Sequence, residues 1–131
     1  MTHEHLDRSE GTRVLVVDDS SQLRRRVCQA LDRAGLTVVG EAADGEQALV
    51  KAAEQQPDVI LMDLRMPKMD GIRATRALHE QQPETPVVLW TGESDVNIGR
   101  AVREAGARAG VPKTIRTAEL VATLLRICAA H

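Results

Sequence analysis

Residues 58–71 read DVILMDLRMPKMDG, an apolar run that ends at an acid and continues into a loop. The apolar residues follow one another without a polar break, which is typical of a strand buried on both faces of a parallel sheet. The acid that ends the run is Asp63, and residues 65–71 contain a proline and a glycine, which favour a loop. This stretch therefore predicts a buried strand over residues 58–63 with a carboxylate at its carboxyl end.

Similar strand segments alternate with helical segments along the rest of the chain. The predicted strands cover residues 13–17, 36–42, 58–63, 86–91 and 108–111. The predicted helices cover residues 21–34, 46–55, 72–81, 95–105 and 117–129. Ser20 is the expected N-cap of the first helix and Gly35 its terminator. Five alternations of this kind predict one α/β domain whose parallel sheet carries helices on both faces.

The composition bounds the class of protein. The chain has 131 residues, enough for one domain, and we expect a polar tail over residues 1–12 ahead of a domain over residues 13–131. Trp90 is the only aromatic residue, and we expect it in a core of aliphatic side chains. No segment approaches the roughly 18 apolar residues that cross a bilayer, and the N-terminus lacks the apolar run of a secretory signal. We therefore expect a cytoplasmic protein with no membrane partner.

Polar residues occur where the predicted strands end. Asp18 and Asp19 follow the first strand, Asp63 ends the third, Thr91 ends the fourth and Lys113 follows the fifth. In an open parallel sheet, ligands bind beyond the carboxyl ends of the strands. An acid pair after a strand is by itself usually a turn or a helix cap. The joint occurrence of the five residues, each at its own strand end, favours a functional site.

The residue types in this set indicate a particular chemistry. Three neighbouring carboxylates repel one another, and a divalent cation offsets that repulsion. Oxygen ligands without histidine or cysteine select a hard ion, Mg²⁺ before Zn²⁺. A carboxylate can also act as a nucleophile and form an acyl phosphate, while a lysine and a hydroxyl stabilise the transferred group. The set therefore predicts a Mg²⁺ site for phosphoryl transfer.

With these features, the chain resembles the receiver domains of response regulators, the chemotaxis-regulator-like proteins of two-component signalling. The matching segments are VLVVDDS (14–20), DVILMDLRMPKMDG (58–71), VVLWTGE (87–93) and GARAGVPK (106–113). The resemblance runs over nearly the whole chain, and the segment around Asp63 together with the upstream acid pair is highly specific. It implies a flavodoxin-like fold with strand order 2-1-3-4-5.

The resemblance also implies a role for each residue of the set. Asp63 matches the aspartate that takes a phosphoryl group from a histidine kinase or a phosphotransfer protein. The Mg²⁺ ligands of the family are matched by Asp63 itself, by Asp19 and by the backbone carbonyl of Arg65. Asp18 matches a further acid, which usually acts through metal-bound water. Thr91 matches the residue whose hydroxyl meets the phosphoryl group. Gly92 matches a small residue that lets the group approach the backbone, and Lys113 matches the lysine whose ammonium pairs with it.

Two positions flank the expected route of the water that hydrolyses the acyl phosphate. In similar domains these are the second residue after the acceptor, here Arg65, and the second after the threonine, here Glu93. We hypothesise that the two side chains pair across that route and lengthen the phosphorylated state. An unchanged dephosphorylation rate in Arg65→Ala would count against this idea.

The chain departs from the family pattern at two positions beside the site. Gly110 stands where the switch phenylalanine or tyrosine usually lies, so coupled rotation of a threonine and an aromatic ring is not available. Thr114 follows Lys113 where proline is common, so the family's cis Lys-Pro bond cannot form. We therefore expect the signal to travel through Thr91 and the backbone, with the helix that contains Gly99 as one route.

Three functions remain open from the sequence. The first is a signalling switch that binds a downstream protein; it is not an enzyme with separate substrate turnover, and the start at Met1 and the short C-terminal end favour a stand-alone regulator over a fragment. The second is a Mg²⁺-dependent phosphatase with an aspartyl nucleophile, although Asp63-Leu64-Arg65 offers no second acid at the expected spacing. The third is a receiver-like module that works without phosphorylation.

The sequence does not predict DNA binding. It has no helix-turn-helix segment or basic stripe, and its net charge of −2 gives no electrostatic attraction to nucleic acid.

Overall fold

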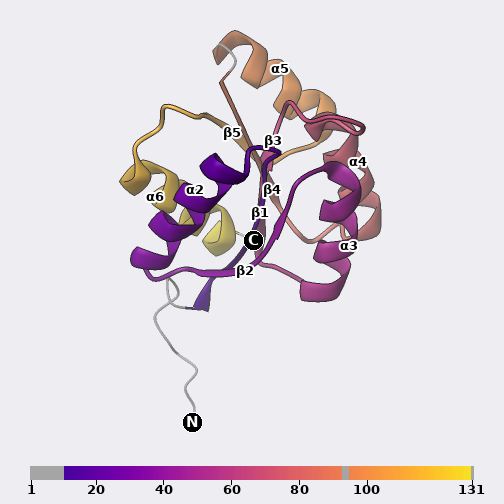
Figure 1. Ribbon diagram of the computed structural model, residues 1–131. Helices are drawn as coiled ribbons and strands as arrows, with labels where there is room; N and C mark the ends of the chain where they lie inside the picture. The colour runs from indigo at the N-terminus through magenta and orange to yellow at the C-terminus, as the bar shows by residue number, and fades with distance from the viewer. Residues whose placement is uncertain (1–10, 93–94, 131) are drawn as a thin grey trace.

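The computed structural model describes residues 11–92 and 95–130, in which strands and helices alternate as the sequence predicts (Figure 1). The strands are β1 (Arg13–Val17), β2 (Thr37–Ala42), β3 (Val59–Asp63), β4 (Val87–Thr91) and β5 (Ala109–Pro112). The helices are α2 (Ser21–Arg33), α3 (Gly45–Gln55), α4 (Gly71–Gln81), α5 (Asp95–Ala105) and α6 (Thr117–Ala130). Across these described residues, none of the helices has the length and apolar character needed to span a membrane.

All five strands are parallel and lie in the order β2-β1-β3-β4-β5, which confirms the predicted topology. The inner strands β3 and β4 are buried along their whole length, whereas the edge strand β2 is mostly half-buried or exposed. Because the strands point the same way, their carboxyl ends meet along one edge of the sheet. Thr12, just before β1, is also buried, and its carbonyl oxygen accepts a hydrogen bond from Thr37 N.

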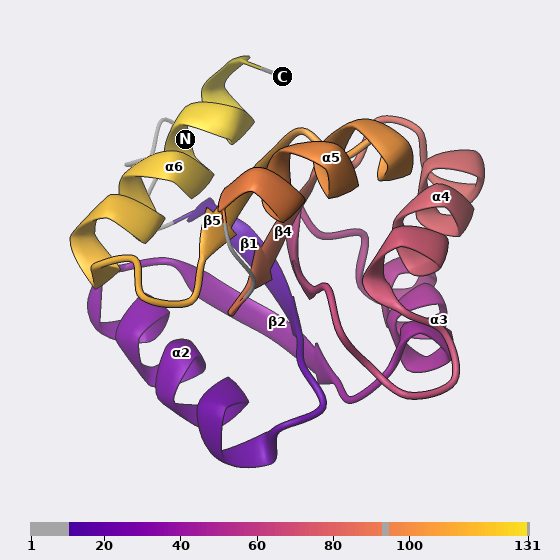
Figure 2. The same cartoon turned by 90° about the horizontal axis from the view of Figure 1, so that it is seen from above.

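Helices cover both faces of the sheet, α2 and α6 on one and α3, α4 and α5 on the other (Figures 1 and 2). Successive strand residues point to opposite faces. Val14 and Val16 of β1 therefore pack with α2 and α6, while Leu15 and Val17 pack with the opposite helices. Aliphatic residues dominate both cores, and Trp90 is the single aromatic side chain, as the sequence predicts.

Short polar side chains begin three of the helices. Ser20, Asp44 and Asp70 each accept a hydrogen bond from the backbone N–H three residues further on, at the starts of α2, α3 and α4. Each side chain replaces a hydrogen bond that the first turn of a helix lacks. The predicted N-cap Ser20 is confirmed, and Gly35, just after α2, has a φ of 94° that suits glycine.

Gly71, the first residue of α4, lies against the backbone of the predicted acceptor. A Cβ atom there would lie 2.4 Å from the carbonyl oxygen of Asp63 and 2.8 Å from Cα of Leu64. The amide of Gly71 donates a hydrogen bond to the carbonyl oxygen of Leu64 at 2.9 Å. The absence of a side chain thus lets α4 begin directly beside the end of β3.

We expect Gly71→Ala to lower the free energy of unfolding by about 2–3 kcal/mol, because the added methyl group must displace backbone rather than a flexible side chain. Urea denaturation monitored by circular dichroism measures the change. Gly99→Ala is the matched control: it also lies in a helix, but a Cβ there has only Arg103 Nη1 nearby, at 3.8 Å. It should be neutral or stabilising by up to about 1 kcal/mol. Equal losses in both variants would contradict the expectation.

Candidate functional site

The carboxyl edge of the sheet gathers the polar residues that the sequence singled out. Asp18 and Asp19 directly follow β1, Asp63 is the last residue of β3, Thr91 is the last residue of β4, and Lys113 directly follows β5. Four separate segments therefore contribute to one site. The parallel sheet brings them together because each side chain stands at the same end of its own strand.

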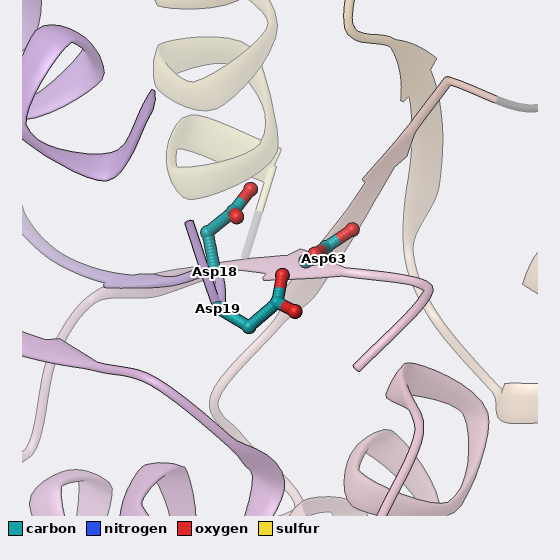
Figure 3. Close-up of side chains that lie close together, drawn as sticks. All are labelled: Asp18, Asp19 and Asp63. Atoms are coloured by element: carbon teal, nitrogen blue, oxygen red, sulfur yellow. The ribbon is translucent and has the colours of Figure 1, made fainter. Parts of the chain in front are cut away.

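The three carboxylates form a compact cluster (Figure 3). One carboxylate oxygen each from Asp18, Asp19 and Asp63 lie within 4.8 Å of one another. Asp18 and Asp63 are buried, with 0% and 2% of their surface exposed, whereas Asp19 is exposed. An all-oxygen set of three acids, open to solvent on one side, fits a hard divalent cation.

Backbone contacts hold Asp18 in place. Its Oδ1 accepts a hydrogen bond from Ser20 N at 2.8 Å, and its own amide donates to the carbonyl oxygen of Ala42 at 3.1 Å. Arg24 Nη1 donates to the carbonyl oxygen of Asp18, and Arg24 Nε pairs with Glu41 Oε1 at 2.9 Å. Residues 24–26 are three consecutive arginines, and a short basic run of this kind on a helix is most often a solvated face. The structure instead turns the side chain of Arg24 inward.

Lys113 lies between the two buried acids. Its Nζ is 2.9 Å from Asp18 Oδ2 and 3.2 Å from Asp63 Oδ1, and its side chain is 23% exposed. The amide of Lys113 donates to the carbonyl oxygen of Thr91 at 2.8 Å, which ties the loop after β5 to the end of β4. The described residues contain no cis peptide bond, the one after Lys113 included. One ammonium thus faces two buried carboxylates.

Burial controls the protonation of this pair. Burial, and after it the charge of Asp18, raise the pKa of Asp63 to about 6, against the opposing effects of Lys113 and the amide of Arg65. Burial by itself would lower the pKa of Lys113, but its contacts with Asp18 and Asp63 raise it above 10.5. At neutral pH the site therefore holds an ammonium and an Asp63 carboxylate that is mostly ionised.

The ring of Trp90 lies close to the same ammonium. Lys113 Nζ is 5.1 Å from the ring centroid, within the range of a cation–π interaction. Trp90 is 2% exposed, so its predicted place in the core is confirmed. Its contact with Lys113 was not predicted, and its position next to Thr91 was the only sequence signal that pointed to it.

The remaining residues of the predicted set lie around this centre. Thr91 is 1% exposed at the end of β4. A Cβ on Gly92 would meet no atom within 4 Å, so open space surrounds that position. The amide of Arg65 donates to Asp63 Oδ1 at 3.3 Å, and its side chain is exposed. Glu93 lies outside the described residues, so its pairing with Arg65 stays a hypothesis.

Gly110, where the related domains usually carry an aromatic residue, is in contact with α5. A Cβ on Gly110 would lie 2.4 Å from Ile98 Cγ2 and 2.8 Å from Val102 Cγ2. Both methyl groups belong to stiff β-branched side chains, which cannot easily move away. Helix α5 therefore packs directly on the backbone of β5, and the two methyl groups occupy the position that a Cβ on Gly110 would take.

The fold and the acidic edge together define the class as a flavodoxin-like α/β domain with a polar site at the carboxyl ends of its strands. The model of the response regulator receiver domain family matches residues 14–125. The chain therefore belongs to the receiver domains of two-component response regulators.

Three similar proteins illustrate the relationship. The chain is 42% identical over 110 residues to the response regulator GacA of Pseudomonas viridiflava, covering 83% of this chain and 51% of GacA. It is 42% identical over 103 residues to protein-glutamate methylesterase/protein-glutamine glutaminase 3 of Hahella chejuensis, covering 76% of this chain and 29% of that protein. The structure of the chemotaxis protein CheY4 of Vibrio cholerae superposes with a TM-score of 0.81 at 35% identity, over 88% of this chain and 98% of that one. The chain thus spans about half or less of these two curated relatives.

Proposed function

We propose that this chain is a phosphorylation switch in which Asp63 takes a phosphoryl group from a histidine kinase or a phosphotransfer protein. The observation that carries the proposal is that the buried Asp63 carboxylate lies beside the acid pair and 3.2 Å from the Lys113 ammonium. The phosphorylated domain would then bind a downstream protein differently. We further propose that it acts in the cytoplasm, as a regulator without separate substrate turnover, and without contacting nucleic acid.

The transfer itself needs an ionised acceptor. A carboxylate oxygen of Asp63 attacks the phosphorus, the bond from phosphorus to the donor's imidazole nitrogen breaks, and its electron pair stays on that nitrogen. Since the pKa of Asp63 is about 6, the carboxylate is available at neutral pH without a separate base. Lys113 balances charge on the transferred group, Thr91 donates a hydrogen bond to it, and the open space at Gly92 leaves it room.

The acid cluster fits Mg²⁺, and Asp18, Asp19 and Asp63 would hold it. The family resemblance adds the backbone carbonyl of Arg65 as a ligand. When bound, Mg²⁺ would offset the negative charge of the phosphoryl group as it approaches the three carboxylates. Apart from Lys113, the residues of the cluster are acidic, so the approach of a phosphoryl group without a cation would be strongly disfavoured.

Intact-mass measurement tests the proposal. With phosphoramidate and Mg²⁺, we expect wild type to gain the mass of one phosphoryl group and Asp63→Ala to gain none. Asp32→Ala is the matched control, because Asp32 is an exposed aspartate on α2 away from the site, and it should gain the group as wild type does. An adduct of equal yield in Asp63→Ala, or no adduct on wild type, would refute the proposal.

The same samples separate a switch from a phosphatase. A phosphatase hydrolyses many equivalents of a phosphomonoester such as p-nitrophenyl phosphate, whereas a switch turns over only its own acyl phosphate. The second residue after Asp63 is Arg65, so this position lacks the second carboxylic acid that an aspartyl-nucleophile phosphatase needs. We therefore expect no multiple turnover of the monoester, and multiple turnover that is lost in Asp63→Ala would support the phosphatase instead.

A further inference from the structure

We propose that Trp90 is a positioning residue for Lys113: the face of its indole ring holds the lysine ammonium where it meets both Asp18 and Asp63. This inference rests on the proposed function, since Lys113 is the group that meets the transferred phosphoryl. The observation behind it is the distance of 5.1 Å between Lys113 Nζ and the centroid of the Trp90 ring.

The surroundings of the ring make this contact effective. Trp90 is 2% exposed, and its ring packs in the core that β1, β3 and β4 share with α2 and α6. Packing in this core restricts how far the ring can move from the ammonium. Attraction between a cation and an aromatic face is larger when water is excluded, and tryptophan has the strongest effect of the aromatic side chains. The contact therefore has both the rigidity and the strength to restrict a flexible lysine.

Lys113 needs such a restriction because of its own flexibility. Its side chain has four rotatable bonds, and its ammonium can pair equally well with nearby carboxylates in several different positions. The carboxylates of Asp18 and Asp63, 2.9 and 3.2 Å from Nζ, also attract the ammonium. In the proposed function, however, these two carboxylates must also interact with a cation and a phosphoryl group. The indole face carries no competing role, so it can hold the ammonium while those carboxylates change partners.

The backbone around Lys113 gives the contact further importance in this chain. The residue after it is Thr114, which is exposed, so no proline ring stiffens the loop at that point. The amide of Lys113 is anchored to the carbonyl oxygen of Thr91, directly after Trp90. The carbonyl oxygen of Trp90 in turn accepts from Leu64 N, directly after Asp63. Trp90 thus connects the backbone of the lysine loop with that of the acceptor.

Substitutions at Trp90 test the inference through the rate of phosphorylation. With phosphoramidate and Mg²⁺, Trp90→Leu should slow formation of the adduct about five- to thirtyfold, which corresponds to a cation–π contact of about 1–2 kcal/mol. Trp90→Phe keeps an aromatic face and should stay within about threefold of wild type. Val88→Ala is the control for lost packing, because Val88 is equally buried on the same face of β4. It should phosphorylate at the wild-type rate once folding is verified by circular dichroism.

If wild type and Trp90→Leu form the adduct at the same rate, the inference is wrong and the proposed function stands. A slowing of Val88→Ala equal to that of Trp90→Leu also overturns the inference, since lost packing then accounts for it. The absence of an adduct on wild type refutes the proposed function.

Fluorescence tests the contact independently of phosphorylation. The chain has one tryptophan and no tyrosine or phenylalanine, so all of its aromatic emission comes from Trp90. Removing the ammonium in Lys113→Met should change the intensity and the wavelength of that emission. Lys68→Met, at an exposed lysine of the loop after β3, should leave the spectrum as in wild type. Identical spectra for wild type and Lys113→Met would show that the ammonium does not rest on the ring, and would overturn the inference.

Discussion

Lys113→Met should lower the free energy of unfolding by about 3 kcal/mol at pH 8 in the presence of EDTA. The ammonium lies 2.9 Å from Asp18 and 3.2 Å from Asp63, and both carboxylates are almost completely buried. Removing one partner of a buried ion pair leaves an uncompensated charge, which costs several kcal/mol. Methionine has a similar length and fills the same space, so the loss reports mainly on charge. Urea denaturation of both proteins measures it.

Two comparisons make this prediction specific. Millimolar Mg²⁺ should recover part of the lost stability, because a cation bound to the native state replaces the missing positive charge. Lys68→Met is the matched control: Lys68 is largely exposed, and its Nζ is 3.9 Å from Asp44, so its removal should cost less than about 1 kcal/mol. A Lys113→Met variant as stable as wild type in EDTA would mean that the ammonium does not stabilise the acid cluster.

Asp63→Asn should have the opposite effect and stabilise the protein above pH 7 by about 3 kcal/mol without divalent cations. The pKa of Asp63 is about 6 in the folded protein, against 3.8 for an unperturbed aspartate, chiefly because the group is buried and then because Asp18 is near. The folded state therefore binds the proton more tightly, and the stability it contributes is complete below pH 3.8 and is lost as the pH rises through 6. Since each tenfold change in the proton equilibrium is worth about 1.4 kcal/mol, the ionised carboxylate costs about 3 kcal/mol.

The pH dependence distinguishes this effect from a general change in packing. Asparagine does not titrate, so the gain over wild type should be large at pH 8 and small at pH 4. Denaturation of both proteins in EDTA over that range gives the difference. Adding Mg²⁺ should stabilise wild type more than Asp63→Asn, because the variant has lost one of its charged ligands. A difference that stays constant from pH 4 to pH 8 would show that the carboxylate of Asp63 is not strained by its surroundings.

Both predictions describe one trade between stability and function. A buried carboxylate beside other acids destabilises the fold, and Lys113 reduces that cost without removing it. The same strain would favour the binding of a cation, and it gives Asp63, the proposed acceptor, a pKa of about 6. Active sites commonly keep groups in such unfavourable surroundings, and removing them stabilises the protein at the expense of activity.

The sequence by itself determined the architecture and the members of the site. Uninterrupted apolar runs such as 59–62 identify buried parallel strands, and helical spacing identifies the segments between them. Because a parallel sheet gathers the carboxyl ends of its strands, residues such as Asp63 and Lys113, 50 positions apart, could be assigned to one site before any distance was known. These features depend on local periodicity and on the direction of the strands, both of which can be read from a single chain.

Only the tertiary structure decided which atoms touch. The inward turn of Arg24, the ring of Trp90 at the ammonium of Lys113, and the close approach of α5 to Gly110 do not follow from residue types or spacing. Each depends on the register between neighbouring strands and on how deeply a helix sits on the sheet. Those quantities are set by the packing of many side chains at once, so no local stretch of sequence contains them.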